Sequence, residues 1–185
     1  MKEKELIDKA KNGDKSALAK LVKEHEKTVY NFAFKICRNP EQAENIMQET
    51  FFSMVKSLHQ FDGNSKLTTW LYRIVSNHCL MAYRKKKNEF LSFDDEEVNA
   101  EHKISKDWSA IPSNAIENNE LKNILDKAIS KLSPDYRIVF ILRDVNGYST
   151  EETGKIANLS VPAVKSRLHR ARAFLRDEIN EAFEK

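Results

Sequence analysis

Apolar residues recur every three or four positions along most of this chain, the spacing that places them on one side of an α-helix. The clearest such stripe lies within residues 15–38. No long alternating pattern typical of a β-strand is found, and glycine and proline occur only four times each. We therefore predict an all-α fold, with helices over residues 3–12, 15–38, 39–60, 66–87, 115–132, 134–146, 149–157 and from 161 past 175.

Residues 39–87 are predicted to form two helices joined by a loop at 61–65. Asn39 can cap the first helix, and Pro40 suits its first turn. The apolar positions of this first helix are Ile46, Met47, Phe51, Met54, Val55 and Leu58. The second helix is predicted to bury one stripe, formed by Leu67, Leu71, Ile74, Val75 and His78.

The opposite side of that second helix has an unusual composition for a merely solvated surface. It is predicted to carry Thr69, Tyr72, Arg73, Ser76, Leu80, Tyr83 and Arg84, with Trp70 and Asn77 at its edge and a basic run at 84–87. Aromatic rings that stack on bases, beside cations that hold phosphates, suit the binding of opened single-stranded nucleic acid. The alternative is a helix buried on two sides that ends in a solvated basic segment.

The carboxy-terminal part has the spacing of a helix-turn-helix. Ser149 and Glu152 form a capping box before a short helix, a turn follows at 158–160, and a longer basic helix begins near Val161. Its predicted buried stripe is Val164, Leu168, Ala171 and Leu175. Ser166, His169, Arg170 and Ala173 are predicted to point away from that stripe, with Lys165, Arg167 and Arg172 on the flanks. The alternative is a basic surface helix on an ordinary bundle.

Charge divides the chain into three parts. Residues 1–88 carry 17 Lys and Arg against 10 Asp and Glu, and residues 116–185 carry 12 against 11. Residues 89–115 carry 2 against 7, include an acidic run at 94–97, and lose the helical period. We predict two small helical domains, 1–88 and 116–185, joined by an acidic flexible linker at 89–115, and the basic excess suggests binding to a polyanion.

Other classes of protein receive little support. The sequence contains no run of 18 apolar residues that could span a membrane, and its first residues lack the apolar core of a signal peptide. We therefore expect a cytoplasmic protein. Cys37 and Cys79 lie far apart in the sequence and are predicted to form neither a disulfide framework nor a metal-ligand pair. An enzyme using His78 and Cys79 is disfavoured, since the two are expected to point in different directions. We predict no catalytic residue, metal or cofactor.

Three blocks in the first half, AENIMQETF at 43–51, FDG at 61–63 and TWLYRIVSN at 69–77, resemble region two of the extracytoplasmic-function (ECF) sigma factors of bacterial RNA polymerase. The run VKSRLHRAR at 164–172 resembles region four of the same family. Asn45 stands where the family usually has Asp, and Thr153 and Gly154 replace an Ile-Ala-like pair. Glycine either weakens that helix or permits unusually close packing.

The resemblance implies an alternative sigma factor that directs promoter-specific initiation. It implies contact with core polymerase through Glu44, Asn45, Gln48, Glu49 and Phe52. It implies capture of the melted minus-ten element by Asn64, Lys66, Thr69, Trp70, Tyr72, Arg73, Asn77, Arg84 and Lys85. It implies reading of the duplex minus-thirty-five element by Lys165, Ser166, Arg167, His169, Arg170 and Arg172. An anti-sigma factor or another regulatory protein is the further partner implied.

A second hypothesis is a DNA-binding regulator that never touches polymerase and uses only its carboxy-terminal motif. The first domain would then serve dimerisation or sensing. This hypothesis leaves the aromatic and basic surface predicted within residues 66–87 unexplained, and binding to duplex DNA without polymerase would favour it.

Overall fold

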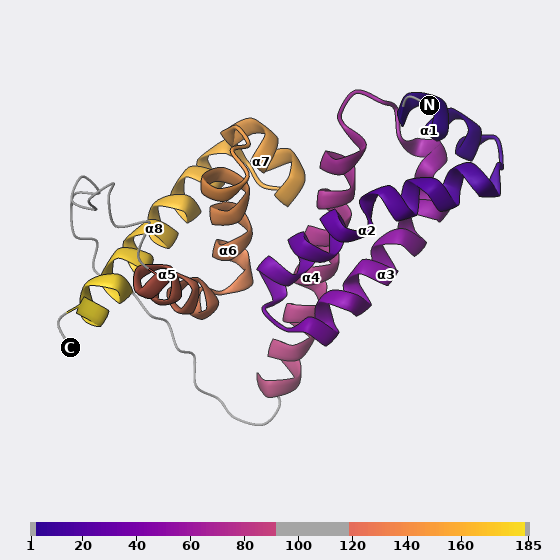
Figure 1. The fold of residues 1–185 in the computed structure, drawn as a ribbon. Helices are drawn as coiled ribbons and strands as arrows, with labels where there is room; N and C mark the ends of the chain where they lie inside the picture. Colours follow the sequence, from indigo (N-terminus) through magenta and orange to yellow (C-terminus); the bar gives the residue numbers. More distant parts are fainter. Residues whose placement is uncertain (1–2, 92–118, 184–185) are drawn as a thin grey trace. The chain divides into compact units, whose positions relative to one another are not determined.

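The computed structural model describes residues 3–91 and 119–183, and all regular elements within these ranges are helical, which confirms the all-α prediction. The helices form two units, α1–α4 and α5–α8 (Figure 1). The predicted linker from residue 92 onward, with its acidic run, lies outside the described residues, as do 116–118. No described helix is long and apolar enough to cross a membrane.

The first unit contains α1 (Glu3–Lys11), α2 (Lys15–Cys37), α3 (Pro40–Ser57), a 3₁₀ turn η1 (Leu58–Gln60) and α4 (Leu67–Leu91). The carboxylate of Asp14 caps α2 by accepting from the amides of Ser16 and Ala17 at 2.8 and 3.0 Å. Asn39 caps α3 as predicted, because its side chain accepts from the Gln42 amide at 2.8 Å. Between these helices Arg38 turns the chain with a φ of 57°.

Helix α4 is longer than predicted. It continues to Leu91, into residues assigned to the linker. The segment from 67 to 91 contains neither glycine nor proline, and its lysines, two arginines and glutamate favour helix, so nothing in this sequence stops the helix at residue 87.

Helix α4 is buried on two sides, which corrects the predicted outward face. Leu67, Leu71 and Val75 are buried as expected, but Tyr72, Ser76 and Leu80 are buried as well. The Tyr72 ring stacks on Phe32 of α2, with centroids 3.9 Å apart and planes 16° apart. On the other side, His78 bonds to Ser53 of α3 at 3.0 Å. The alternative of a helix with two packed sides is therefore correct for this part of α4.

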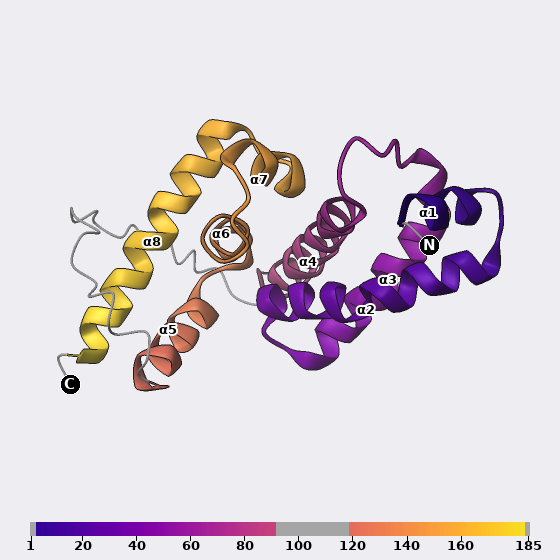
Figure 2. The same cartoon turned by 45° about the horizontal axis from the view of Figure 1, so that its top comes forward.

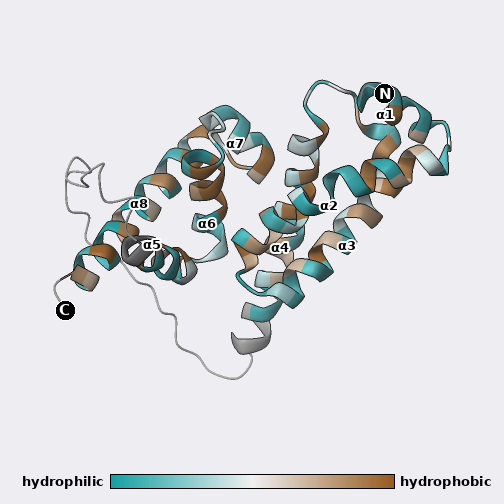
Figure 3. Ribbon diagram, in the orientation of Figure 1, coloured by the Kyte–Doolittle hydropathy of each residue, from teal (hydrophilic) through white to brown (hydrophobic). Residues whose placement is uncertain are grey.

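The second unit contains α5 (Asn119–Lys131), α6 (Pro134–Phe140), a π-helical turn η3 (Ile141–Val145), α7 (Thr150–Ala157) and α8 (Val161–Phe183). Helices α5 and α6 both pack against α8, as Figure 2 shows. Figure 3 shows apolar and polar segments alternating along these helices, the amphipathic pattern from which they were predicted. The predicted stripe of Val164, Leu168, Ala171 and Leu175 is buried. Ala173, which was predicted to point away from it, is buried too.

A buried arginine joins α5 to α6. Arg137 is only 5% exposed, and its guanidinium donates to the carbonyls of Ile129 at 2.9 Å, Ser130 at 2.6 Å and Leu132. These carbonyls belong to the end of α5, where backbone acceptors have no partner within the helix and where the helix dipole favours a cation. Sequence reasoning missed this role, since Arg137 lies within an otherwise apolar segment.

The turn before α8 depends on a close approach of the backbone to a glycine. Ser149 and Glu152 form the predicted capping box, with reciprocal bonds of 2.8 and 3.1 Å. Asn158 then adopts a φ of 54°, and the Leu159 amide donates to the Gly154 carbonyl at 2.8 Å. A Cβ at Gly154 would lie 2.7 Å from the Leu159 carbonyl oxygen. Close packing is therefore the reason that glycine suits this position.

We expect Arg137→Met to destabilise the second unit by about 3 kcal/mol, because it keeps the apolar stem but leaves buried carbonyls without a donor. Hydrogen exchange of the α5 and α6 amides, measured on the full chain, isolates this unit. Lys131→Met is the control: it removes an exposed ion pair to Glu178 and should leave exchange nearly unchanged. Equal effects of both variants would contradict the capping role.

We expect Gly154→Ala to destabilise the second unit by about 1–2 kcal/mol, although alanine is the better helix former by about 1 kcal/mol. The methyl group would press on a backbone oxygen that cannot move without distorting the turn. Thermal unfolding checks this. Lys155→Ala, at an exposed position of α7, is the control and should be neutral. Stabilisation by Gly154→Ala would show that the turn adapts easily.

Candidate nucleic-acid interfaces

The first half of α8 presents a polar surface to solvent. Lys165, Ser166, His169 and Arg170 are all exposed, whereas Val164 and Leu168 of the same helix are buried. The hydroxyl and imidazole can exchange hydrogen bonds with base edges, and the two cations suit phosphates or guanine. The helix-turn-helix spacing therefore brings together four of the six residues predicted to contact duplex DNA on one open face.

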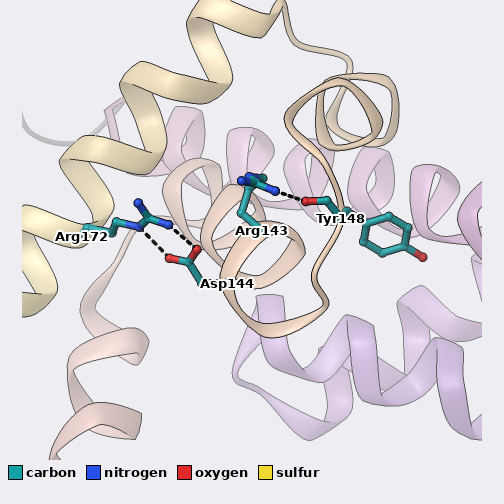
Figure 4. A network of polar contacts seen from close by, with 4 residues as sticks. All are labelled: Arg143, Asp144, Tyr148 and Arg172. Atoms are coloured by element: carbon teal, nitrogen blue, oxygen red, sulfur yellow. Dashed lines mark hydrogen bonds and ion pairs between the residues drawn. The ribbon is translucent and has the colours of Figure 1, made fainter. Parts of the chain in front are cut away.

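The other two predicted residues, Arg167 and Arg172, are paired within the unit. Arg172 bonds Asp144 of η3 through Nε at 2.8 Å and Nη2 at 2.6 Å, a two-pronged contact drawn in Figure 4. The hydrogen bond that Arg172 donates to this carboxylate raises the pKa of Arg172 above its ordinary value. Arg167 pairs with Asp135 at 3.1 Å. Both arginines therefore connect α8 to the preceding elements, Arg167 to α6 and Arg172 to η3.

The entry into α7 is held by a further contact. Arg143 donates through Nη1 to the backbone carbonyl of Tyr148, as Figure 4 shows. Asp144, the next residue, holds Arg172, so neighbouring residues of η3 anchor both the loop and α8. Asp135, Arg143 and Asp144 were missed by sequence reasoning, because their partners cannot be paired from spacing alone.

The exposed side of α4 is narrower than predicted. Arg73, Asn77, Arg84 and Lys85 are exposed there, and Thr69 and Trp70 are half-buried. Tyr72 is 7% exposed and its ring faces Phe32, so it cannot offer a free face to a base. The exposed groups of this surface are therefore mainly cations and an amide, and its aromatic members, Trp70 and Tyr83, are half-buried.

The loop before α4 is ordered by its own side chains. Asp62 accepts from the Asn64 backbone amide at 3.0 Å and from the Asn64 side chain at 2.7 Å, and these bonds lower the pKa of Asp62. Gly63 between them has a φ of 76°. The predicted residues Asn64 and Lys66 are exposed. The Asp-Gly-Asn pattern could have identified Asp62 as the residue that orients Asn64.

One end of this loop is anchored to α1. Lys11 donates to the Phe61 carbonyl, and its ammonium lies 5.8 Å from the centroid of the Phe61 ring. Phe61 in turn packs against Trp70, with centroids 5.4 Å apart. Lys11 was not predicted, since 50 positions separate it from its acceptor. The contact chain explains why Trp70 is only half-exposed.

A separate surface lies on α3. Glu44, Asn45, Gln48, Glu49 and Phe52 recur at helical spacing, and all five are exposed. Phe52 is 58% exposed, and the Lys56 ammonium lies 4.0 Å from its ring centroid. Val55, one of the apolar positions of the predicted helix, is 49% exposed on the same helix. An exposed aromatic ring beside acidic and amide groups is typical of a protein-binding surface.

Cys37 and Cys79 are thiols that lie next to each other. Cys37 and Cys79 are distant in sequence, yet their sulfurs lie 3.1 Å apart, with Cys79 buried. His78 does not join them, because its ring bonds to Ser53. Within residues 3–91 and 119–183 no group of three or more metal-ligating side chains occurs.

Comparison with known families identifies both units. The family model Sigma-70 region 2 matches residues 21–89, and Sigma-70 region 4 matches residues 122–175. Two solved structures share the fold, each with a TM-score of 0.63. CnrH in complex with the cytosolic domain of CnrY is 23% identical and covers 95% of this chain and 96% of that one. The sigma factor RpoE with the anti-sigma factor NepR, from Bartonella quintana, is 22% identical and covers 88% and 96%.

Curated relatives agree with these matches. The ECF RNA polymerase sigma factor SigW of Bacillus subtilis is 34% identical over 183 residues, covering 96% of this chain and 97% of that protein. The RNA polymerase sigma-H factor of Pseudomonas aeruginosa is 27% identical, covering 92% and 90%. With region 2 and region 4 in order and a relative similar along almost its whole length, the chain belongs to the ECF sigma factors of bacterial RNA polymerase.

Proposed function

We propose that this sigma factor selects its promoters through two surfaces, one on α4 with its preceding loop and one on α8. Family membership establishes the coarser function, an alternative sigma factor that directs transcription initiation. The observation that carries the finer proposal is the open face of Lys165, Ser166, His169 and Arg170 on the second helix of a helix-turn-helix.

For the minus-thirty-five element, Lys165, Ser166, His169 and Arg170 enter the major groove of duplex DNA. Arg167 and Arg172 contribute differently. Their guanidiniums are paired with Asp135 and Asp144, so they orient α8, and their remaining N–H donors are left for phosphates. Base reading therefore falls to the residues whose side chains have open surroundings.

For the minus-ten element, the loop residues Asn64 and Lys66 and the α4 residues Arg73 and Asn77 contact bases and phosphates of the opened strand. Arg84 and Lys85 extend the cationic track along the same helix. Thr69 and Trp70 border it, and the half-buried Trp70 ring, which packs against Phe61, is the aromatic group of α4 nearest the loop. Tyr72 has no part in base contact, because its ring is stacked on Phe32.

Core polymerase binds the α3 surface of Glu44, Asn45, Gln48, Glu49 and Phe52. Its exposed aromatic ring, framed by polar groups, supports a protein partner rather than DNA. An anti-sigma factor is a further partner, a proposal supported by the fold shared with RpoE of Bartonella quintana, whose structure was solved with its anti-sigma factor NepR. Association with polymerase places the protein in the cytoplasm.

The second candidate, a regulator independent of polymerase, is disfavoured by the matched region 2. The experiment that separates the two is a pull-down with purified core polymerase followed by run-off transcription from a promoter library. Stable association and initiation at a two-block motif support the sigma proposal. Binding to duplex DNA alone, without association with polymerase, would instead support the regulator.

We expect Arg170→Ala to reduce discrimination at one minus-thirty-five position by about 1–3 kcal/mol without unfolding the chain, because this side chain is exposed. Arg172→Ala is the contrasting variant. It releases Asp144 and should lower the melting temperature, while base preference stays unchanged. Initiation rates across single-base promoter variants measure the first effect. Uniform loss on every sequence would show that Arg170 contacts only phosphate.

We expect Asn77→Ala to reduce open-complex formation roughly tenfold, the effect of losing one contact worth about 1–2 kcal/mol, while polymerase binding is retained. Phe52→Ala should do the reverse and weaken the pull-down, since it removes the apolar centre of the α3 surface. Permanganate reactivity of the minus-ten thymines reports opening. If Asn77→Ala opens DNA normally, the surface on α4 has been assigned wrongly.

A further inference from the structure

Cys37 and Cys79 form a pair that no proposed function uses. Cys37 is the last residue of α2, and Cys79 lies in the middle of α4. Their Sγ atoms are 3.1 Å apart, in direct contact as two thiols. Cys37 is half-buried and Cys79 is 2% exposed, so Cys37 is the more accessible residue of the pair.

The geometry suits a covalent bond between the two sulfurs. A disulfide requires a separation of about 2.05 Å, so the sulfurs must approach by roughly 1 Å. Cys37 ends its helix, and Arg38 beside it has already left the helical conformation with a φ of 57°. A helix terminus yields more readily than a helix centre, and the small movement can therefore be taken up at the end of α2.

A metal site is the competing explanation for paired cysteines. Zinc sites need three or four protein ligands. The neighbouring His78 is directed at Ser53, and no cluster of three metal-ligating side chains occurs in the described part of the chain. With no third metal-ligating side chain grouped with them in the described residues, the two adjacent thiols favour sulfur chemistry over metal binding.

We propose that Cys37 and Cys79 are an oxidation site that a peroxide converts to an intramolecular disulfide. The Cys37 thiolate attacks the peroxide O–O bond, forming a sulfenic acid and releasing hydroxide, which becomes water. The Cys79 sulfur then attacks the Cys37 sulfur, loses its proton and displaces the hydroxyl group as a second water. The two sulfurs together lose two electrons, and one hydrogen peroxide is reduced to two waters.

The exposure of the two residues sets the order of events. Cys37 meets the oxidant first because it is the less buried of the two, and Cys79 is the resolving thiol because it is buried and its sulfur lies 3.1 Å away. The rapid second step protects Cys37 from further oxidation to sulfinic acid. The disulfide links α2 to α4 covalently. It lowers the conformational entropy of the unfolded chain and so stabilises the first unit.

The test uses the full chain, reduced, freed of reductant and treated with hydrogen peroxide. Intact mass should fall by two hydrogen atoms, denatured protein should no longer take up N-ethylmaleimide, and a digest should contain a peptide joining Cys37 to Cys79. Reductant should restore two reactive thiols. The melting temperature of the oxidised monomer should rise by on the order of 10 °C.

Two variants separate the roles. In Cys79→Ala the Cys37 sulfenic acid has no resolving partner, so it should be trapped by dimedone as an adduct. In Cys37→Ala the buried Cys79 should react at least tenfold more slowly, while circular dichroism confirms that each variant is folded. The proposal is overturned if peroxide leaves both thiols intact, adds oxygen to Cys37 without a disulfide, or produces only cross-linked dimers. It does not depend on the promoter contacts, because no readout involves DNA.

Discussion

The packing of α4 on two sides determines what the first unit can present to a partner. The Phe32–Tyr72 stack holds α4 against α2, and the Ser53–His78 bond holds it against α3. A helix enclosed in this way keeps only a narrow exposed strip, and that strip contains Arg73, Asn77 and the basic residues that follow. The same enclosure brings Cys79 to the end of α2, where it meets Cys37.

In the second unit, arginines serve structure and recognition in different ways. Arg137 is buried and donates hydrogen bonds to the carbonyls at the end of α5. It therefore stabilises the junction of α5 and α6, the two helices that pack against α8. Arg172 is held by both oxygens of Asp144, and Arg167 by one oxygen of Asp135. Arg170 has only a 3.5 Å contact to the Tyr136 hydroxyl. These three arginines of α8 therefore differ in how strongly other side chains of the unit hold them, and so in how available they are for contacts with DNA.

The loop at 61–65, which carries the proposed base-contacting residue Asn64, is ordered by contacts within and outside it. Its conformation follows from the Asp62–Asn64 bonds within the loop and from Lys11 outside it. These bonds favour the ionised form of Asp62 and lower its pKa. Their contribution to the loop arrangement is therefore complete at pH values above the ordinary pKa of an aspartate, and it is lost as the pH falls through the lowered pKa of Asp62. The exposed amide of Asn64 is thus oriented before any DNA arrives.

Local chemistry was enough to predict the helices, because caps, breakers and the helical period act within a few residues. Asn39, the Ser149–Glu152 box and the turn at 158–160 were all identified from sequence. Period alone could not tell that α4 packs on two neighbours, so Tyr72, Ser76 and Leu80 were assigned to the wrong side. Nor could it pair Arg172 with Asp144, or Cys37 with Cys79. Such contacts join positions 28 to 42 residues apart, and only the packing of helices against one another brings them within bonding distance.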